Sequence, residues 1–241
     1  MASTTESSFG AKLRRAQDLL TYIQGFAGYT PPRAQESATG FQTLITSIIT
    51  SNTSEINAQQ QYKVAVDARQ AAFKTNLVSI TKLLPQIKGA VEAQYGKKST
   101  EATAVNAIIK TMRASKLIVT PATPSTDPNN PTVEQTLSQS EKSYGSQTQY
   151  FNDLINTISQ FTGYAPSNNN IKLPQLQTFS TSITTLNTAV AQKLQPLKTA
   201  RATRTASYKD LKDRVQRIKQ YVKAQFGTNS NEYKLIKGIS I

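Results

Sequence analysis

The sequence predicts an all-α protein made of two tandem antiparallel helical bundles, about four helices each, related by internal duplication. Two long segments repeat the same residue pattern, and apolar residues recur three and four positions apart. Because single cores usually take roughly 100–200 residues, the 241 residues suit two small domains. We therefore expect a first repeat unit at 1–116, a proline-rich linker and lead-in at 117–144, and a second repeat unit at 145–241.

The duplication is visible as matching residues at a constant distance. Residues 18–31 align with 153–166 at an offset of 135 (153 − 18), and both segments end in Gly-Tyr-x-Pro. The same offset continues to residue 53. Beyond it, 87–96 matches 218–227 at an offset of 131 (218 − 87). The second copy has therefore lost four residues (135 − 131), about one helical turn.

Each copy opens with an amphipathic helix, expected at roughly 9–27 and 145–162. The helix should end at Gly28 in the first copy and at Gly163 in the second, because glycine readily adopts the left-handed conformation of a C-cap. The proline that follows each turn prevents the helix from continuing. These turns could instead be exposed recognition loops, but helix termination is the simpler explanation.

The second and third helices are expected from apolar seams at helical spacing. In the second copy the seams cover 176–194 and 208–226, and in the first copy the seam of the third helix covers 77–95. This third helix should be the longest of each copy.

A short fourth helix is expected at the end of each copy. The chain should turn at Gly96 and at Gly227, after which Ser99 and Ser230 can cap the helix N-terminus. A glutamate two residues after each serine lies where the helix dipole favours negative charge. Between the copies, 117–131 holds four prolines and should be extended or turn rather than form a helix.

The composition removes whole classes of function. The chain has no Cys and no His, which excludes Ser-His-Asp triads, thiol nucleophiles, thiolate zinc sites and histidine metal ligands. We find no glycine-rich phosphate loop, acidic calcium loop or closely spaced carboxylate pair. We therefore expect no catalytic residue, no metal, no cofactor and no small-molecule ligand. No apolar run approaches the ~18 residues of a membrane span, and residues 1–8 lack the features of a signal peptide, so a cytoplasmic location is expected.

Two acid–lysine pairs occupy equal positions in both copies. They are Asp18 with Lys88 and Asp153 with Lys219. A carboxylate beside a lysine could serve catalysis, but without a neighbouring nucleophile or metal a structural ion pair between the first and third helices is the simpler prediction.

The strongest functional lead is a basic stretch at 193–223. The chain carries 28 Lys and Arg against 14 Asp and Glu, a net charge of +14, and this stretch holds ten of the basic residues against two Asp. Such a ridge could follow a phosphate backbone. A solvated face is the plainer alternative, because Val78, Thr81 and Glu92 replace three of its lysines in the first copy. The candidate polyanion-binding residues are Lys198, Arg201, Arg204, Lys209, Lys212, Lys219 and Lys223.

The segment 222–233, echoed at 91–101, resembles a signature of uncharacterised bacterial helical tandem-repeat proteins. The resemblance covers only the end of each copy. It implies duplication and a bacterial source, and it implies no activity, substrate or catalytic residue.

Three functions remain open at this point. The first is a non-enzymatic structural or interaction protein, a scaffold that contacts a protein partner or other copies of itself. The alternative is a nucleic-acid-binding protein without sequence specificity that uses the basic ridge, since no base-reading motif is present. An enzyme using Asp, Lys or Tyr ranks last.

Overall fold

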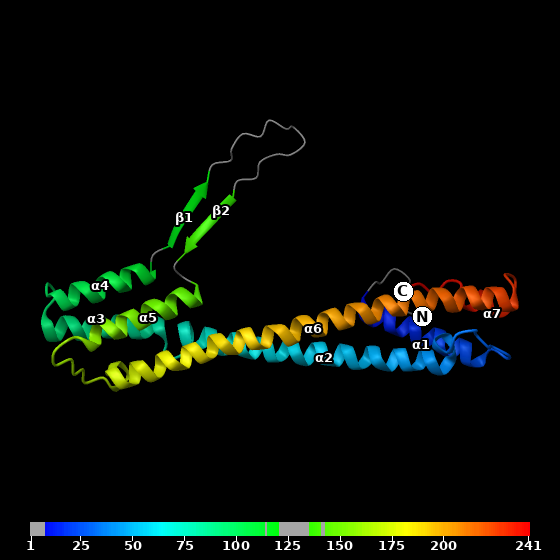
Figure 1. The fold of residues 1–241 in the computed structure, drawn as a ribbon, viewed down its shortest axis with the longest axis horizontal. Helices are drawn as coiled ribbons and strands as arrows, with labels where there is room; N and C mark the ends of the chain where they lie inside the picture. Colours follow the sequence, from blue (N-terminus) through cyan, green and yellow to red (C-terminus); the bar gives the residue numbers. More distant parts are fainter. Residues whose placement is uncertain (1–7, 114, 121–134, 141–142) are drawn as a thin grey trace, which may run out of the picture. The chain divides into compact units, whose positions relative to one another are not determined.

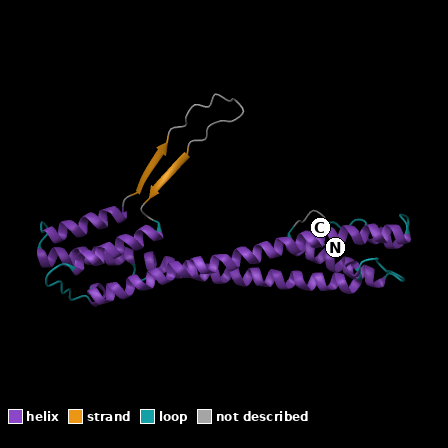
Figure 2. Cartoon of the chain, viewed as in Figure 1, coloured by secondary structure: helices purple, strands orange, loops and turns teal. Residues whose placement is uncertain are grey.

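The computed structural model describes residues 8–113, 115–120, 135–140 and 143–241, and these residues are mostly helical (Figures 1 and 2). The helical class expected from the sequence is confirmed. In chain order the helices are α1 (Phe9–Gly25), α2 (Ala38–Gln70), α3 (Ile80–Tyr95), α4 (Thr100–Arg113), α5 (Tyr144–Ser159), α6 (Leu173–Phe226) and α7 (Asn231–Ile236). Short 3-10 turns at Ala34–Glu36 and Asn169–Ile171 precede α2 and α6, and a π turn at Ala71–Thr75 follows α2.

Two short strands overlap the linker and lead-in expected at 117–144, of which the sequence predicts 117–131 to be extended or turn. Strand β1 (Ser115–Thr120) pairs antiparallel with β2 (Gln135–Ser140), with Ser115 opposite Ser140 and Thr120 opposite Gln135. The rest of the expected linker, at 121–134 and 141–142, lies outside the described residues. So do residues 1–7 at the start of the chain.

The chain forms two compact units whose boundaries differ from the expected repeat units at 1–116 and 145–241. The terminal unit combines Met1–Tyr62 with Lys193–Ile241, and the central unit is Lys63–Gln192. The physical reason is the continuity of α6. The second and third helices expected in the second copy form one helix without a turn, so its first part packs in the central unit and its last part in the terminal unit.

The core of the terminal unit joins helices from both copies. Leu19 and Ile23 of α1 and Phe41 of α2 pack in one cluster with Leu211 and Ile218 of α6. All five side chains are buried. In Figure 1, α1, the first part of α2, the last part of α6 and α7 lie together. The first half of copy one is thus packed against the second half of copy two.

The core of the central unit is the complementary combination. Phe151 and Ile158 of α5 and Ile183 of α6 share a cluster with Ile87 of α3 and Val105 of α4. The helices of each expected repeat unit, 1–116 and 145–241, are therefore divided between the two cores.

The third helix of the first copy also begins later than the sequence predicts. It starts at Ile80, because the chain turns after the π segment, and Leu77 is 88% exposed.

Gly96 and Gly227 directly follow α3 and α6, as predicted. The helices α1 and α5 end earlier than predicted, at Gly25 and Ser159, so Gly28 and Gly163 lie in the turns that follow them. All four glycines have positive φ. The angles are 75° at Gly28, 78° at Gly163, 96° at Gly96 and 95° at Gly227. This is the left-handed region that L side chains avoid.

The two predicted cap serines also accept backbone hydrogen bonds. Ser99 Oγ accepts from the Ala102 amide at 3.0 Å, and Ser230 Oγ accepts from the Tyr233 amide at 3.1 Å. These are the N-cap contacts that the sequence predicts.

The Gly-Tyr-x-Pro turns make the same hydrogen bonds in both units. Tyr29 donates its hydroxyl to the Glu36 carbonyl at 2.8 Å, and Tyr164 donates to the Ile171 carbonyl at 3.0 Å. Burial raises the pKa of Tyr164 to about 12 and, with the Glu36 charge, raises that of Tyr29 further. Each tyrosine fastens its own turn.

The glycine turns are also held from the other copy. Gln225 Nε2 donates to the Gly28 carbonyl at 2.6 Å, and the equivalent Gln94 donates to the Gly163 carbonyl. A helix of one copy therefore supports a turn of the other.

Candidate polyanion surface and charged turn

The seven basic residues predicted to bind polyanions separate into two groups. Arg201 and Arg204 bind Glu55 of α2, with Nε–Oε1 at 3.3 Å and Nη1–Oε2 at 2.9 Å. The Glu55 side chain is only 5% exposed. The Arg204 guanidinium also lies over the Phe9 ring, 4.4 Å from its centroid. Both arginines are thus paired within the terminal unit, Arg204 mostly buried and Arg201 half exposed.

Lys219 is also committed to the fold. Its Nζ donates to the Ile239 carbonyl at 2.9 Å, and partial burial lowers its pKa. Of the seven, Lys198, Lys209, Lys212 and Lys223 remain exposed, and none has an ion-pair partner among the described residues.

These four lysines, the lysine stripe, lie along one side of α6. At 100° per residue, the positions 198, 209, 212 and 223 fall within an arc of about 60°. The stripe covers 25 residues (223 − 198), about 37 Å of helix. Spacing and exposure suit contact with several phosphates of one strand.

Neither predicted acid–lysine pair occurs among the ion pairs of the described residues. Asp18 binds Arg14 of its own helix at 3.3 Å, and Lys88 binds Glu92 at 3.7 Å. The reason is the division of the chain into the two units. Asp18 belongs to the terminal unit and Lys88 to the central unit, while Asp153 and Lys219 are divided the opposite way.

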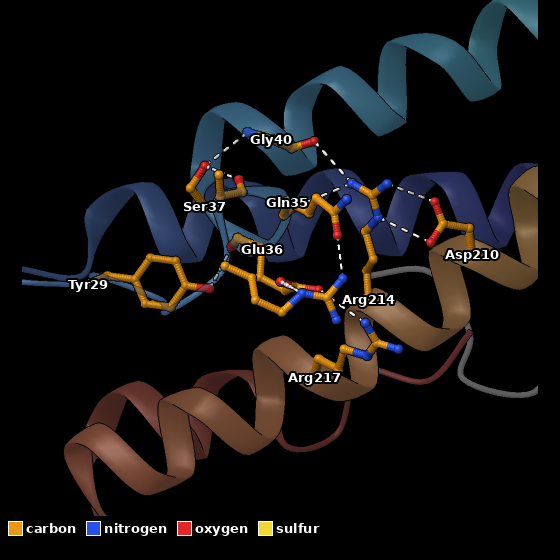
Figure 3. A network of polar contacts seen from close by, with 10 residues as sticks. Tyr29, Gln35, Glu36, Ser37, Gly40, Asp210, Arg214 and Arg217 are labelled. Atoms are coloured by element: carbon orange, nitrogen blue, oxygen red, sulfur yellow. Dashed lines mark hydrogen bonds and ion pairs between the residues drawn. The ribbon is translucent and has the colours of Figure 1, made fainter.

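A charged turn that the sequence analysis did not single out joins the start of α2 to α6 (Figure 3). Arg214 binds Asp210 through two nitrogens, at 2.8 and 3.1 Å. It also donates to the carbonyl oxygens of Gln35 at 3.3 Å and Gly40 at 3.5 Å. The arginine therefore fastens the 3-10 turn to α6.

Glu36 is buried at the centre of this turn, with 3% of the residue exposed. Its carboxylate lies 3.4 Å from Arg33 Nε and 3.7 Å from Arg217 Nη1. Neither carboxylate oxygen has a hydrogen-bond donor among the described residues. Arg33 also donates to Gln35. The Arg33–Glu36 spacing is visible in sequence, but Arg217 comes from the far end of the chain.

A groove of about 1150 Å³ runs between α2 and α6 in the terminal unit. Short hydroxyl and alanine side chains dominate its walls, including Thr43, Ser47 and Ser54 on α2 and Thr199 and Thr203 on α6. Such side chains allow a further helix to approach closely.

The described residues contain no group of three or more potential metal ligands, and no helix among them is apolar enough over a sufficient length to cross a membrane. The resemblance of 222–233 to bacterial repeat proteins stays a prediction. No protein-family model, curated protein or solved structure gives a significant match to the chain.

Proposed function

We propose that the protein is a non-enzymatic structural scaffold built from a duplicated helical unit, whose two copies have exchanged halves. The observation that carries the proposal is the role of the repeated residues. Gly28 and Gly163, and the glutamines that donate to them, serve turns and interhelical contacts in both units. The residues shared by the two copies thus have structural roles in both units.

The groove between α2 and α6 offers the scaffold a surface for self-association. Its short side chains leave room for a helix of a second molecule, which would bury the groove in the manner of helix-in-groove recognition.

Self-association can be tested with Ser47→Arg combined with Thr203→Arg. Both residues are exposed and line the groove, so the two arginines should block a docked helix without disturbing the core. Sedimentation over about 1–100 µM should show concentration-dependent association of the parent and a monomeric double variant. Thr53→Arg, exposed on α2 outside the groove, is the matched control. A parent that stays monomeric throughout this range would contradict self-association.

The lysine stripe supports a second function, binding of nucleic acid without sequence specificity. Four exposed lysines on one side of a single helix provide phosphate contacts, and the terminal unit offers no repeated row of exposed aromatic side chains on that helix for base stacking. Affinity should therefore depend on salt far more than on sequence.

Reversal of the stripe is expected to abolish this binding. We expect Lys198→Glu, Lys209→Glu, Lys212→Glu and Lys223→Glu together to flatten the salt dependence of duplex DNA binding by a log–log slope of about 3 to 4. The measurement is a titration of labelled duplex DNA at about 50 and 200 mM salt. The control reverses four exposed lysines of the central unit, Lys74, Lys97, Lys98 and Lys110, for the same change in net charge. Equal losses in the two variants would show that net charge, and not the stripe, governs binding.

A further inference from the structure

A cavity of about 820 Å³ opens beside the charged turn in the terminal unit. Its walls come from residues 31–36 and from one face of α6, residues 213–221. Pro31, Pro32 and the Tyr221 ring form its apolar part. The Tyr221 ring meets Tyr29 edge to face, with centroids 5.8 Å apart, and its hydroxyl donates to the Thr30 carbonyl. The apolar wall is thus fixed in place, and the volume is that of a small-molecule site.

The polar part of the cavity is built around the buried Glu36. Burying a carboxylate without hydrogen bonds costs free energy unless a neighbouring charge compensates it. Two neighbouring arginines provide that compensation. Arg33 and Arg217 approach the carboxylate from opposite walls, and about half of each arginine side chain remains exposed. Glu36 therefore holds two guanidinium groups together while part of each faces the cavity.

The central unit contains the matching cavity without the charges. At the positions equivalent to Arg33 and Arg217 it has Asn168 and Gln86, which are joined by a hydrogen bond of 3.0 Å. Ile171 takes the place of Glu36 and is equally buried, at 2% exposure. The cavity itself is about 470 Å³. The turn thus folds with neutral residues, so the charges of the terminal unit are not required by the fold.

The balance of charge around the larger cavity is positive. Arg33, Arg217 and Lys219 carry three positive charges against the two negative charges of Glu36 and Asp213, a net of +1 (3 − 2). Guanidinium groups form paired, charge-assisted hydrogen bonds with carboxylate and phosphate oxygens. Asn and Gln side chains are neutral and cannot form them.

We propose that this cavity binds a small ligand that carries an oxyanion, either a carboxylate or a phosphate, next to an apolar body. The oxyanion is held by the outward N–H groups of Arg33 and Arg217, which Glu36 positions from below. The apolar body lies against Tyr221 and the two prolines. The site is independent of the lysine stripe and of the groove between α2 and α6.

The test is calorimetric titration of the full-length protein with three probes: benzoate, phenyl phosphate and inorganic phosphate. Benzoate or phenyl phosphate should bind one molecule per chain with a dissociation constant of about 1 mM or below. Arg217→Gln and Arg33→Asn, which install the residues of the central unit, should each weaken binding about tenfold or more. The thermal midpoint of each variant checks that the unit stays folded.

Lys193→Gln is the matched control, because it removes one exposed positive charge from the same helix, outside the cavity and outside the lysine stripe. It should leave the affinity within about twofold of the parent. Tighter binding of phenyl phosphate than of benzoate identifies a phosphate ester as the ligand class, and the reverse order identifies a carboxylate. The proposal is overturned by the absence of binding for all three probes up to about 10 mM. It is equally overturned if Arg217→Gln weakens binding no more than Lys193→Gln does.

Discussion

Replacing Gly40 with alanine is expected to destabilise the terminal unit by about 3 kcal/mol. A Cβ at this position would stand 2.9 Å from Gln35 Cα and closer still to the Ala34 carbonyl oxygen. Both neighbours are backbone atoms of the 3-10 turn, so no side-chain rotation relieves the clash. Chemical denaturation followed by circular dichroism measures the loss. The contacts of Arg214 and Ser37 with Gly40 should weaken together with it.

Gly89→Ala is the control for this prediction. Gly89 lies inside α3, and nothing lies within 4 Å of the position that its Cβ would take. Because alanine favours helix over glycine, this change should stabilise the central unit by up to about 1 kcal/mol. The second copy carries Gln175 at the position equivalent to Gly40, exposed and with a side chain. If Gly40→Ala unfolds with the same denaturant midpoint as the parent, the close approach of the 3-10 turn to Gly40 is ruled out.

Replacing Glu55 with alanine is expected to cost about 3 kcal/mol, because it leaves Arg201 and Arg204 without their counter-charge. The Arg204 side chain is only 23% exposed, and its Nε has no hydrogen-bond partner among the described residues. Arg204 therefore suffers most from the loss of the carboxylate. Denaturant unfolding of the full chain measures this effect.

The central unit carries uncharged residues at both equivalent positions. Val190 and Phe73, both buried, occupy the positions equivalent to Glu55 and Arg204. Glu55→Val alone should therefore destabilise the terminal unit, whereas Glu55→Val together with Arg204→Phe should recover most of the loss. A double variant no more stable than the single one would show that the arginine is not the residue left uncompensated.

Local features of this chain could be predicted from its sequence because their causes are local. A glycine before a tyrosine forms a turn with positive φ in both repeated segments, at Gly28 and Gly163, shortly after the preceding helices have ended. The serine caps at Ser99 and Ser230 follow for the same reason, since each contacts an amide three residues later.

The packing of α1 and α2 against the last part of α6 could not be predicted from apolar periodicity. The two repeated segments have nearly the same seams, so periodicity alone does not select the partner of each helix. One signal was present in the sequence. The second copy lacks four residues relative to the first, which turns between α2 and α3 where α6 continues as one helix. If the four residues are those that reverse the chain direction between α2 and α3, their absence predicts that the second and third helices of the second copy join into one helix.

The candidate site shows the same division. The lysines of the stripe could be selected from the sequence, because their spacing along one helix is a local property. The commitment of Arg201 and Arg204 to Glu55 depends on a contact between residues about 150 positions apart, which charge pattern alone does not indicate.

The division of the chain into a terminal and a central unit sets the order in which the protein can fold on the ribosome. The central unit, Lys63–Gln192, is complete in the nascent chain before Lys193–Ile241 has been made. The helices α1 and the start of α2 emerge first, yet their core partners on α6, such as Leu211 and Ile218, are synthesised last. The apolar side chains of Leu19, Ile23 and Phe41 therefore stay without these core partners until translation is nearly finished. The first helices to be synthesised are thus the last to be buried in a complete core.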